Sequence, residues 1–206
     1  MLGLFNYPKD ADFSPIITLK FILNNYTIMI ILGIDPGTII TGYGIIRQNF
    51  STCRRIASGS IKLPQKQNLP QKLETIYNEL DKLIKIYKPS EFAIETAFYG
   101  KNAQSAMKIG YAKGVSILAA AHNQIPTSEY SPREIKKSVV GKGAASKQQV
   151  YFMVKNLLDI KKEKMKFDET DALAVALCHA FRMTRRKSKN KDWKSFIEAN
   201  PERVIE

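Results

Sequence analysis

Apolar residues along the chain fall into short continuous runs and longer runs with helical spacing. The first short run, residues 28–35, is rich in isoleucine and too short for a helix, and a Pro-Gly pair follows it, so it predicts a buried strand that ends at a turn. Residues 41–46 predict a return strand, and residues 52–63 predict a third, more polar strand. Because the connections are short, we expect these three strands to be antiparallel neighbours.

A strong helical pattern begins at Pro70, and apolar residues recur every three or four positions along one face up to Lys88. Residues 92–95 predict a fourth strand, so this helix is expected to cross over the sheet. A helix rich in small residues over 102–122 and a short strand over 126–130 complete the predicted sheet.

Three helices are predicted after the last strand. The run Ser-Pro-Arg-Glu at 131–134 is a capping signature for a helix that ends near Gly141, and Ser146 is expected to cap another helix that runs to residue 158. A charged connector leads to the last predicted helix, over 168–182. This order predicts one α/β domain over residues 29–182, a mixed five-stranded sheet flanked by helices.

Both ends of the chain are interpreted as lying outside that domain. Residues 1–28 are read as an N-terminal extension, and one hypothesis is that Met29 is the true start and an upstream codon was assigned in its place. The apolar stretch 16–34 is interrupted by polar residues and fits a membrane span poorly. Residues 183–206 predict a basic C-terminal tail that either contacts DNA or is a solvated terminus.

The charge of the chain narrows the class of partner. With 32 Lys and Arg against 19 Asp and Glu, the formal net charge is +13, which attracts nucleic acid or an anionic membrane surface. No basic amphipathic helix favours the membrane, so no membrane partner is expected. The two cysteines, Cys53 and Cys178, form neither a disulfide framework nor a zinc motif, which predicts a reduced, cytoplasmic setting.

Four carboxylates mark the ends of the predicted elements. Asp35 and Glu95 close apolar strands, and Asp168 and Asp171 open the last helix, three residues apart and so on one face. Taken singly, Asp35 is equally well explained as a turn residue, and the helical pair as an acidic first turn that the helix dipole favours. Glu95 is harder to explain structurally, because a charge that ends an apolar central strand is costly to bury unpaired.

If the four carboxylates converge, they predict a two-metal hydrolytic site. They would repel one another and raise one another's pKa unless a cation lies between them. Oxygen ligands without nearby His or Cys favour Mg²⁺, with Mn²⁺ as a substitute, over zinc. Two such ions activate a water and stabilise the leaving oxygen when a phosphodiester is hydrolysed.

The motifs that carry these acids, in this order, resemble those of the RuvC family of Holliday-junction resolvases. The resemblance runs from about Met29 to about His179 and is carried by residues 33–37 (Gly-Ile-Asp-Pro-Gly), 41–44 (Thr-Gly-Tyr-Gly), 92–95 with Phe98, 101–103, 114–115, 139–141 with Lys147, and 168–174 (Asp-Glu-Thr-Asp-Ala-Leu-Ala). One motif alone is weak, but the ordered set is highly specific.

The resemblance implies an RNase H-like fold, a homodimer, and a structure-selective endonuclease that nicks two opposing strands of a four-way junction symmetrically. It implies that Asp35, Glu95, Asp168 and Asp171 are the catalytic acids and bind Mg²⁺, with two ions expected per subunit. It also implies a role in homologous recombination and DNA repair together with the RuvA and RuvB branch-migration proteins.

The resemblance further implies DNA contacts outside the four acids. Phe98 matches a family aromatic that stacks on a junction base, and the alternative is a packed loop aromatic. Tyr99 either shares that role or only packs. Lys147 and Lys136 match basic residues near the scissile phosphate, and their alternative is generic solvated lysine.

Three rival functions stay open at the level of sequence. The Gly-Ile-Asp-Pro-Gly-Thr run at 33–38 also looks like the phosphate loop of actin/Hsp70-type ATPases, although that fold needs two lobes and a second Asp-x-Gly loop that the chain lacks. A DNA-binding protein without activity would keep the basic surface alone, and a transposase or RNase H relative would share the metal chemistry. Cleavage of a four-way junction, a linear duplex and an RNA–DNA hybrid separates these possibilities.

Overall fold

Three antiparallel strands form one half of the central sheet. The computed structural model describes residues 28–49, 52–96, 103–161 and 164–189. Strand β1 (Met29–Asp35) pairs with β2 (Ile40–Asn49), which in turn pairs with β3 (Thr52–Lys62). The predicted strand-turn-strand order is confirmed, because both pairings are antiparallel as the short connections require.

Two parallel strands extend the sheet on the other side of β1. Helix α2 (Leu69–Tyr87) crosses over to β4 (Glu91–Glu95), which pairs parallel to β1, and α3 (Ala103–His122) leads to β5 (Thr127–Tyr130), parallel to β4. The strand order is β3-β2-β1-β4-β5. The predicted α/β class with a mixed five-stranded sheet is therefore confirmed.

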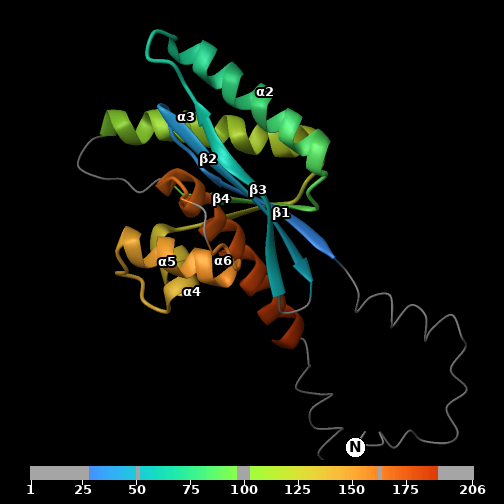
Figure 1. The fold of residues 1–206 in the computed structure, drawn as a ribbon. Helices are drawn as coiled ribbons and strands as arrows, with labels where there is room; N and C mark the ends of the chain where they lie inside the picture. The colour runs from blue at the N-terminus through green and yellow to red at the C-terminus, as the bar shows by residue number, and fades with distance from the viewer. Residues whose placement is uncertain (1–27, 50–51, 97–102, 162–163, 190–206) are drawn as a thin grey trace, which may run out of the picture.

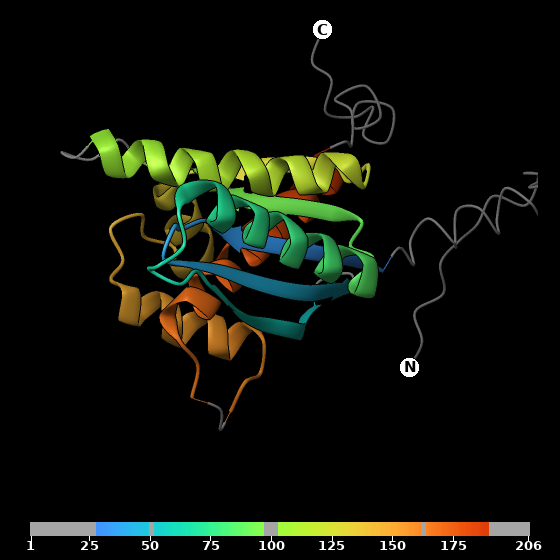
Figure 2. The same cartoon turned by 90° about the horizontal axis from the view of Figure 1, so that it is seen from above.

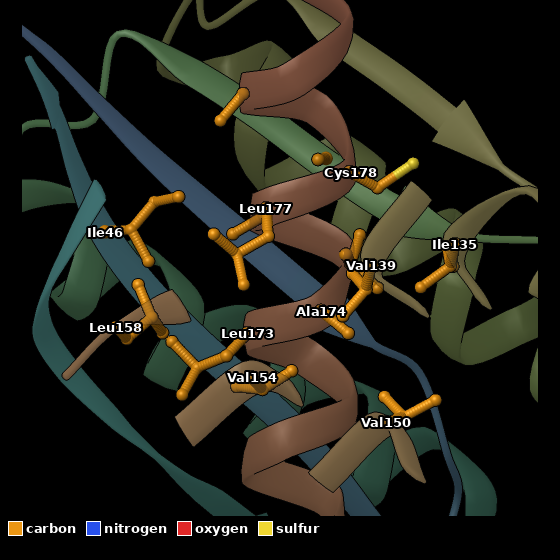
Figure 3. Packing of buried hydrophobic residues seen from close by; sticks show 14 of the residues in the cluster. Ile46, Ile135, Val139, Val150, Val154, Leu158, Leu173, Ala174, Leu177 and Cys178 are labelled. Atoms are coloured by element: carbon orange, nitrogen blue, oxygen red, sulfur yellow. The ribbon is translucent and has the colours of Figure 1, made fainter. Parts of the chain in front are cut away.

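Helices cover both faces of this sheet (Figures 1 and 2). Helices α2 and α3 pack on one face, where their apolar residues meet inward-facing side chains of β1, β2 and β4. The opposite face carries α4 (Pro132–Val140), α5 (Lys147–Leu157) and α6 (Phe167–Lys189), whose apolar residues form the second core cluster. Figure 3 shows α6 at the centre of that cluster, between the sheet and the two shorter helices.

Local capping chemistry fixes where the short helices begin. The Ser131 hydroxyl accepts from the Glu134 amide at 3.3 Å, and the Glu134 carboxylate accepts from the Ser131 amide at 2.9 Å. Ser146 likewise accepts from the amide of Gln149 at 3.2 Å. Both predicted caps are confirmed, and they set the starts of α4 and α5, which flank the site described below.

Glycines let α6 lie directly on the sheet. A Cβ built on Gly33 of β1 would lie 2.6 Å from the Ala176 amide nitrogen, and one on Gly42 of β2 would collide with the Asp168 carbonyl. No side chain larger than hydrogen fits between the strands and the helix at these two positions. The start of α6 is thereby pressed against the end of β1.

The last helix is longer than predicted. The sequence predicts an end at residue 182 and a tail over residues 183–206, but α6 continues to Lys189. The side-chain amide of Gln48 on β2 donates to the Ala180 carbonyl at 3.1 Å and to the Thr184 hydroxyl at 2.7 Å. A strand distant in sequence therefore holds this turn of the helix. The rest of the predicted tail and the predicted extension up to residue 27 lie outside the described residues. None of the helices in the described part combines the length and apolarity that a membrane span requires.

Candidate active site

Two of the predicted acids lie at the same edge of the sheet. Asp35 is the last residue of β1 and Glu95 the last residue of β4. These strands are parallel neighbours, and Ile34 pairs with Ile94 in their register, so the two carboxylates follow at adjacent positions. Side chains beyond the carboxyl ends of neighbouring parallel strands are well placed to share one ligand.

The first turns of α6 bring the other two acids to this edge. Asp171 lines a pocket of about 220 Å³ together with Asp35 and Glu95. Asp168 is not among the lining residues, but its charge acts on both Asp35 and Asp171. The close approach of α6 to Gly42 fixes this placement, because the backbone of Asp168 lies against β2.

Helices α4 and α5 complete the pocket and supply its cations. Lys136 of α4 and Lys147 of α5 both line it. The Lys147 ammonium lies 3.4 Å from Asp171 Oδ2, and its side chain is 68% exposed, so it remains open to solvent and to a ligand. Apolar and small side chains form the remaining wall: Pro132, Ile135, Val150 and Ala174.

Burial and the closeness of other carboxylates raise the pKa values of the acids in the pocket. Burial, followed by repulsion from Asp171, raises the pKa of Asp35 from 3.8 to about 7, although the charge of Lys147 opposes this. Burial and the charge of Asp35 raise the pKa of Glu95 to about 8. Burial also raises the pKa of Asp171, against the attraction of Lys147. Raised acid pKa values in a cleft are typical of functional sites.

The donor chemistry of the pocket fits a hard divalent cation. Within the described ranges, no three His, Cys, Asp or Glu side chains close in tightly enough to enclose a metal ion. The carboxylates repel one another, since neighbouring acids raise the pKa values of Asp35 and Glu95, and a divalent charge between Asp35, Glu95 and Asp171 would offset this repulsion. Carboxylate oxygens are the ligands that Mg²⁺ prefers.

The predicted DNA-contacting residues divide into two groups. Lys136 and Lys147 both line the pocket, and the role near the scissile phosphate that the family resemblance implies for them stays a prediction. Phe98 and Tyr99 lie outside the described residues, so their predicted role stays a prediction. The pocket wall from α4 and α5 was not predicted, because apolar residues give no sign in the sequence of which cavity they border.

Comparisons with known proteins identify the family of the chain. The family model described as crossover junction endodeoxyribonuclease RuvC matches residues 31–179. A protein of that name from Chloroherpeton thalassium is 45% identical over 185 residues, which cover 86% of this chain and 100% of the relative. The protein of that name from Saccharophagus degradans is 47% identical over 150 residues, covering 73% of this chain and 86% of the relative.

Solved structures show the same fold. Thermus thermophilus RuvC superposes with a TM-score of 0.70 at 27% identity, covering 77% of this chain and 97% of that one. The same enzyme in complex with a Holliday junction substrate gives a TM-score of 0.72 at 28% identity, covering 77% and 96%. The fold is therefore RNase H-like, and the chain belongs to the RuvC family of crossover junction endodeoxyribonucleases.

Proposed function

We propose that the protein resolves Holliday junctions by Mg²⁺-dependent nicking of two opposing strands. The observation that carries the proposal is the shared pocket, in which Asp35, Glu95 and Asp171 from three separate elements face two lysines. The family match and the likeness to a RuvC bound to a Holliday junction support the choice of substrate. The family match and this likeness favour a nuclease over an actin/Hsp70-type ATPase and over a DNA-binding protein without activity.

The four acids are proposed to hold two Mg²⁺ ions per subunit, and Mn²⁺ is expected to substitute. When bound, such ions activate a water and stabilise the leaving oxygen of the cleaved phosphodiester. Asp35 and Glu95 contribute from a rigid sheet edge, while Asp168 and Asp171 contribute from the helix packed on it. Regular secondary structure on both sides fixes the backbone positions of these acids, which limits the reorganisation needed when the ions and the substrate bind.

The lysines of the pocket are proposed to act on the phosphate. Lys147 is placed by the capped first turn of α5 and is held toward the acids by Asp171. An ammonium at this position attracts the scissile phosphate and offsets negative charge that develops on its oxygens. Lys136, from α4, borders the same pocket and adds to its positive potential.

A homodimer through the outer face of α3 is proposed to supply the second cut. Met107, Tyr111 and Leu118 expose 60%, 44% and 46% of their surface along this helix. Gly110 and Gly114 lie between them with no atom near a built Cβ, so a second helix has room to approach closely. An isologous dimer places two pockets about one twofold axis, as symmetric nicking requires. Size measurement by light scattering tests it: Leu118→Arg should yield monomers, and Ile86→Arg on α2 should not.

Cleavage of a synthetic four-way junction is the primary test. Each of the four strands is labelled in turn, and a linear duplex of the same sequence serves as the comparison substrate, with Mg²⁺ and with EDTA. We expect paired, ligatable nicks in opposing strands of the junction only, and only with Mg²⁺. Equal cleavage of the duplex would refute the proposed selectivity.

Amide variants test the four acids. Asp35→Asn, Glu95→Gln, Asp168→Asn and Asp171→Asn should each abolish cleavage and leave junction binding largely intact. Asp159→Asn is the matched control, since its carboxylate is 78% exposed and paired only with Lys161 among the ion pairs of the described residues. Full activity in any of the four would remove that residue from the site.

Cooperation with RuvA and RuvB in recombination and repair, and a cytoplasmic location, are proposed from family membership alone. Adding both proteins to the junction assay should change the position or rate of cleavage as the branch point moves. An unchanged cleavage pattern under active branch migration would refute the cooperation.

A further inference from the structure

Two side-chain contacts join α5 to α6 near the start of each helix. One of them lies at the pocket and the other lies one helical turn away from it. The contact at the pocket is the ion pair between Lys147 and Asp171. Tyr151 follows Lys147 by one helical turn on α5, Phe167 precedes Asp171 by one turn on α6, and the rings of Tyr151 and Phe167 contact each other. Because a helical turn rises about 5.4 Å, this aromatic pair lies roughly one nucleotide's reach from the pocket.

The aromatic pair holds one ring in place and leaves it open. The ring centroids of Tyr151 and Phe167 lie 5.7 Å apart at an interplanar angle of 63°, an edge-to-face contact. The Met165 amide donates to the Tyr151 hydroxyl at 3.3 Å, which ties the chain entering α6 to α5. Phe167 nevertheless remains 45% exposed. The pair therefore presents a fixed apolar ring to solvent beside the carboxylates.

Lysines lie close to Tyr151 and precede Phe167 in the chain, which favours a polyanionic partner for the pair. The Lys155 ammonium lies 5.6 Å from the centre of the Tyr151 ring, and Lys147 is one turn away on the same face of α5. Lys164 and Lys166, both exposed, immediately precede Phe167. An exposed aromatic ring among lysines matches a nucleotide, which offers a flat base to the ring and a phosphate to the ammonium groups.

We propose that Phe167, held by Tyr151, stacks on a nucleotide next to the scissile phosphate. The inference rests on the proposed function, since it needs a DNA strand in the acidic pocket. It assigns to α6 a second task besides carrying Asp168 and Asp171: the same helical turn binds the strand whose phosphate is to be cut. Such a contact fixes the register of the strand, and stacking of this kind tolerates any base because every base has a flat face.

Photo-cross-linking on a four-way junction tests the contact directly. 5-Iodouracil replaces a base on the 5′ side or the 3′ side of the cleavage site, which is first mapped with the full-length wild-type protein in Mg²⁺. Irradiation is then carried out in Ca²⁺, and the cross-linked residue is identified by mass spectrometry. We expect a cross-link to Phe167 from one of the two positions, kept in Phe167→Tyr and lost in Phe167→Leu.

Cleavage rates of the same variants complete the test. Phe167→Leu should slow cleavage about tenfold while lowering the melting temperature only slightly, through loss of the edge-to-face contact, and Phe167→Tyr should restore the rate. The matched control is Phe152→Leu, an aromatic of α5 that is 64% exposed, which should change neither the rate nor the cross-link.

Several outcomes would overturn the inference. A wild-type protein that cuts the junction but gives no cross-link to Phe167 from either position refutes the stacking contact, whatever the variants do. Slower cleavage in Phe167→Leu that Phe167→Tyr fails to restore would mean that the ring only supports the acids. If the wild type neither binds nor cuts the junction, the proposed function fails first, and this inference fails with it.

Discussion

Replacing Asp35 with asparagine is expected to stabilise the cation-free protein while it abolishes cleavage. In the folded state the Asp35 carboxylate is largely buried in the pocket that it shares with Asp171 and Glu95. Its charged form is therefore disfavoured relative to the unfolded chain, where water surrounds it. Asparagine has nearly the same shape without the charge, so it removes this cost and also the proposed cation ligand.

The pKa of Asp35 gives the size and the pH dependence of the effect. It rises from 3.8 to about 7 on folding. The folded protein therefore binds the proton more tightly, and wild-type stability falls as the pH rises between these two values. At roughly 1.4 kcal/mol per pH unit, the full cost above pH 7 is about 4 kcal/mol. The Asp35→Asn variant should recover about 2–4 kcal/mol at pH 8, less at pH 5, and close to nothing below pH 4.

Urea unfolding in EDTA at pH 5 and pH 8 measures this difference. Asp159→Asn is the control, because its exposed carboxylate should change stability little at either pH. Adding Mg²⁺ at pH 8 should stabilise the wild type and stabilise Asp35→Asn less, since a ligand that binds only the folded state raises its stability. A variant that is no more stable than wild type at pH 8, or equally stabilised at both pH values, would refute the reasoning.

Three further predictions follow from the packing and the charge. Gly33→Ala should lower the free energy of unfolding in urea by about 1–3 kcal/mol and reduce cleavage. Its Cβ would lie 2.6 Å from the Ala176 amide nitrogen and force α6 off the sheet. A variant as stable as the wild type would show that α6 adjusts freely. His179→Ala should cost about 3 kcal/mol, because the ring is 1% exposed, bonds the Tyr130 hydroxyl at 2.7 Å and lies 3.3 Å from Glu91; a loss under about 1 kcal/mol in the same assay would contradict it. Junction binding by Asp35→Asn, followed by fluorescence anisotropy, should weaken about 10³-fold between roughly 50 and 200 mM salt, and a flat salt dependence would mean that the basic surface does not contact phosphate.

The parts of the fold with local causes were predictable from the sequence. The apolar runs of β1 and β4 end at Asp35 and Glu95, so strand positions and the two acids came from the same pattern. The caps at Ser131 and Ser146 depend on residues three positions apart and were likewise predictable. The convergence of the acids was inferred from the family motifs, and the parallel register of β1 and β4 supplies its physical cause.

Features with distant causes could not be predicted. The side-chain amide of Gln48, far away in the chain, donates to the Thr184 hydroxyl and so stabilises the turn of α6 just past residue 182. Gly33 and Gly42 were recognised as motif residues, but their physical role, the close approach of α6, exists only once helix and sheet are packed. The pair of Tyr151 and Phe167 was missed for the same reason, since neither residue carries a signal that names its partner.

The late position of α6 in the chain affects when the protein can become active during its synthesis. Two of the proposed ligands, Asp168 and Asp171, lie on α6, which follows β1 and β4 in the chain and is therefore synthesised after both strands. A nascent or prematurely terminated copy that lacks this helix carries an incomplete set of acids and, on the proposed chemistry, leaves the chromosome uncut. On the proposed chemistry, the chain therefore becomes able to cut DNA only after α6 has been synthesised and has packed on the sheet.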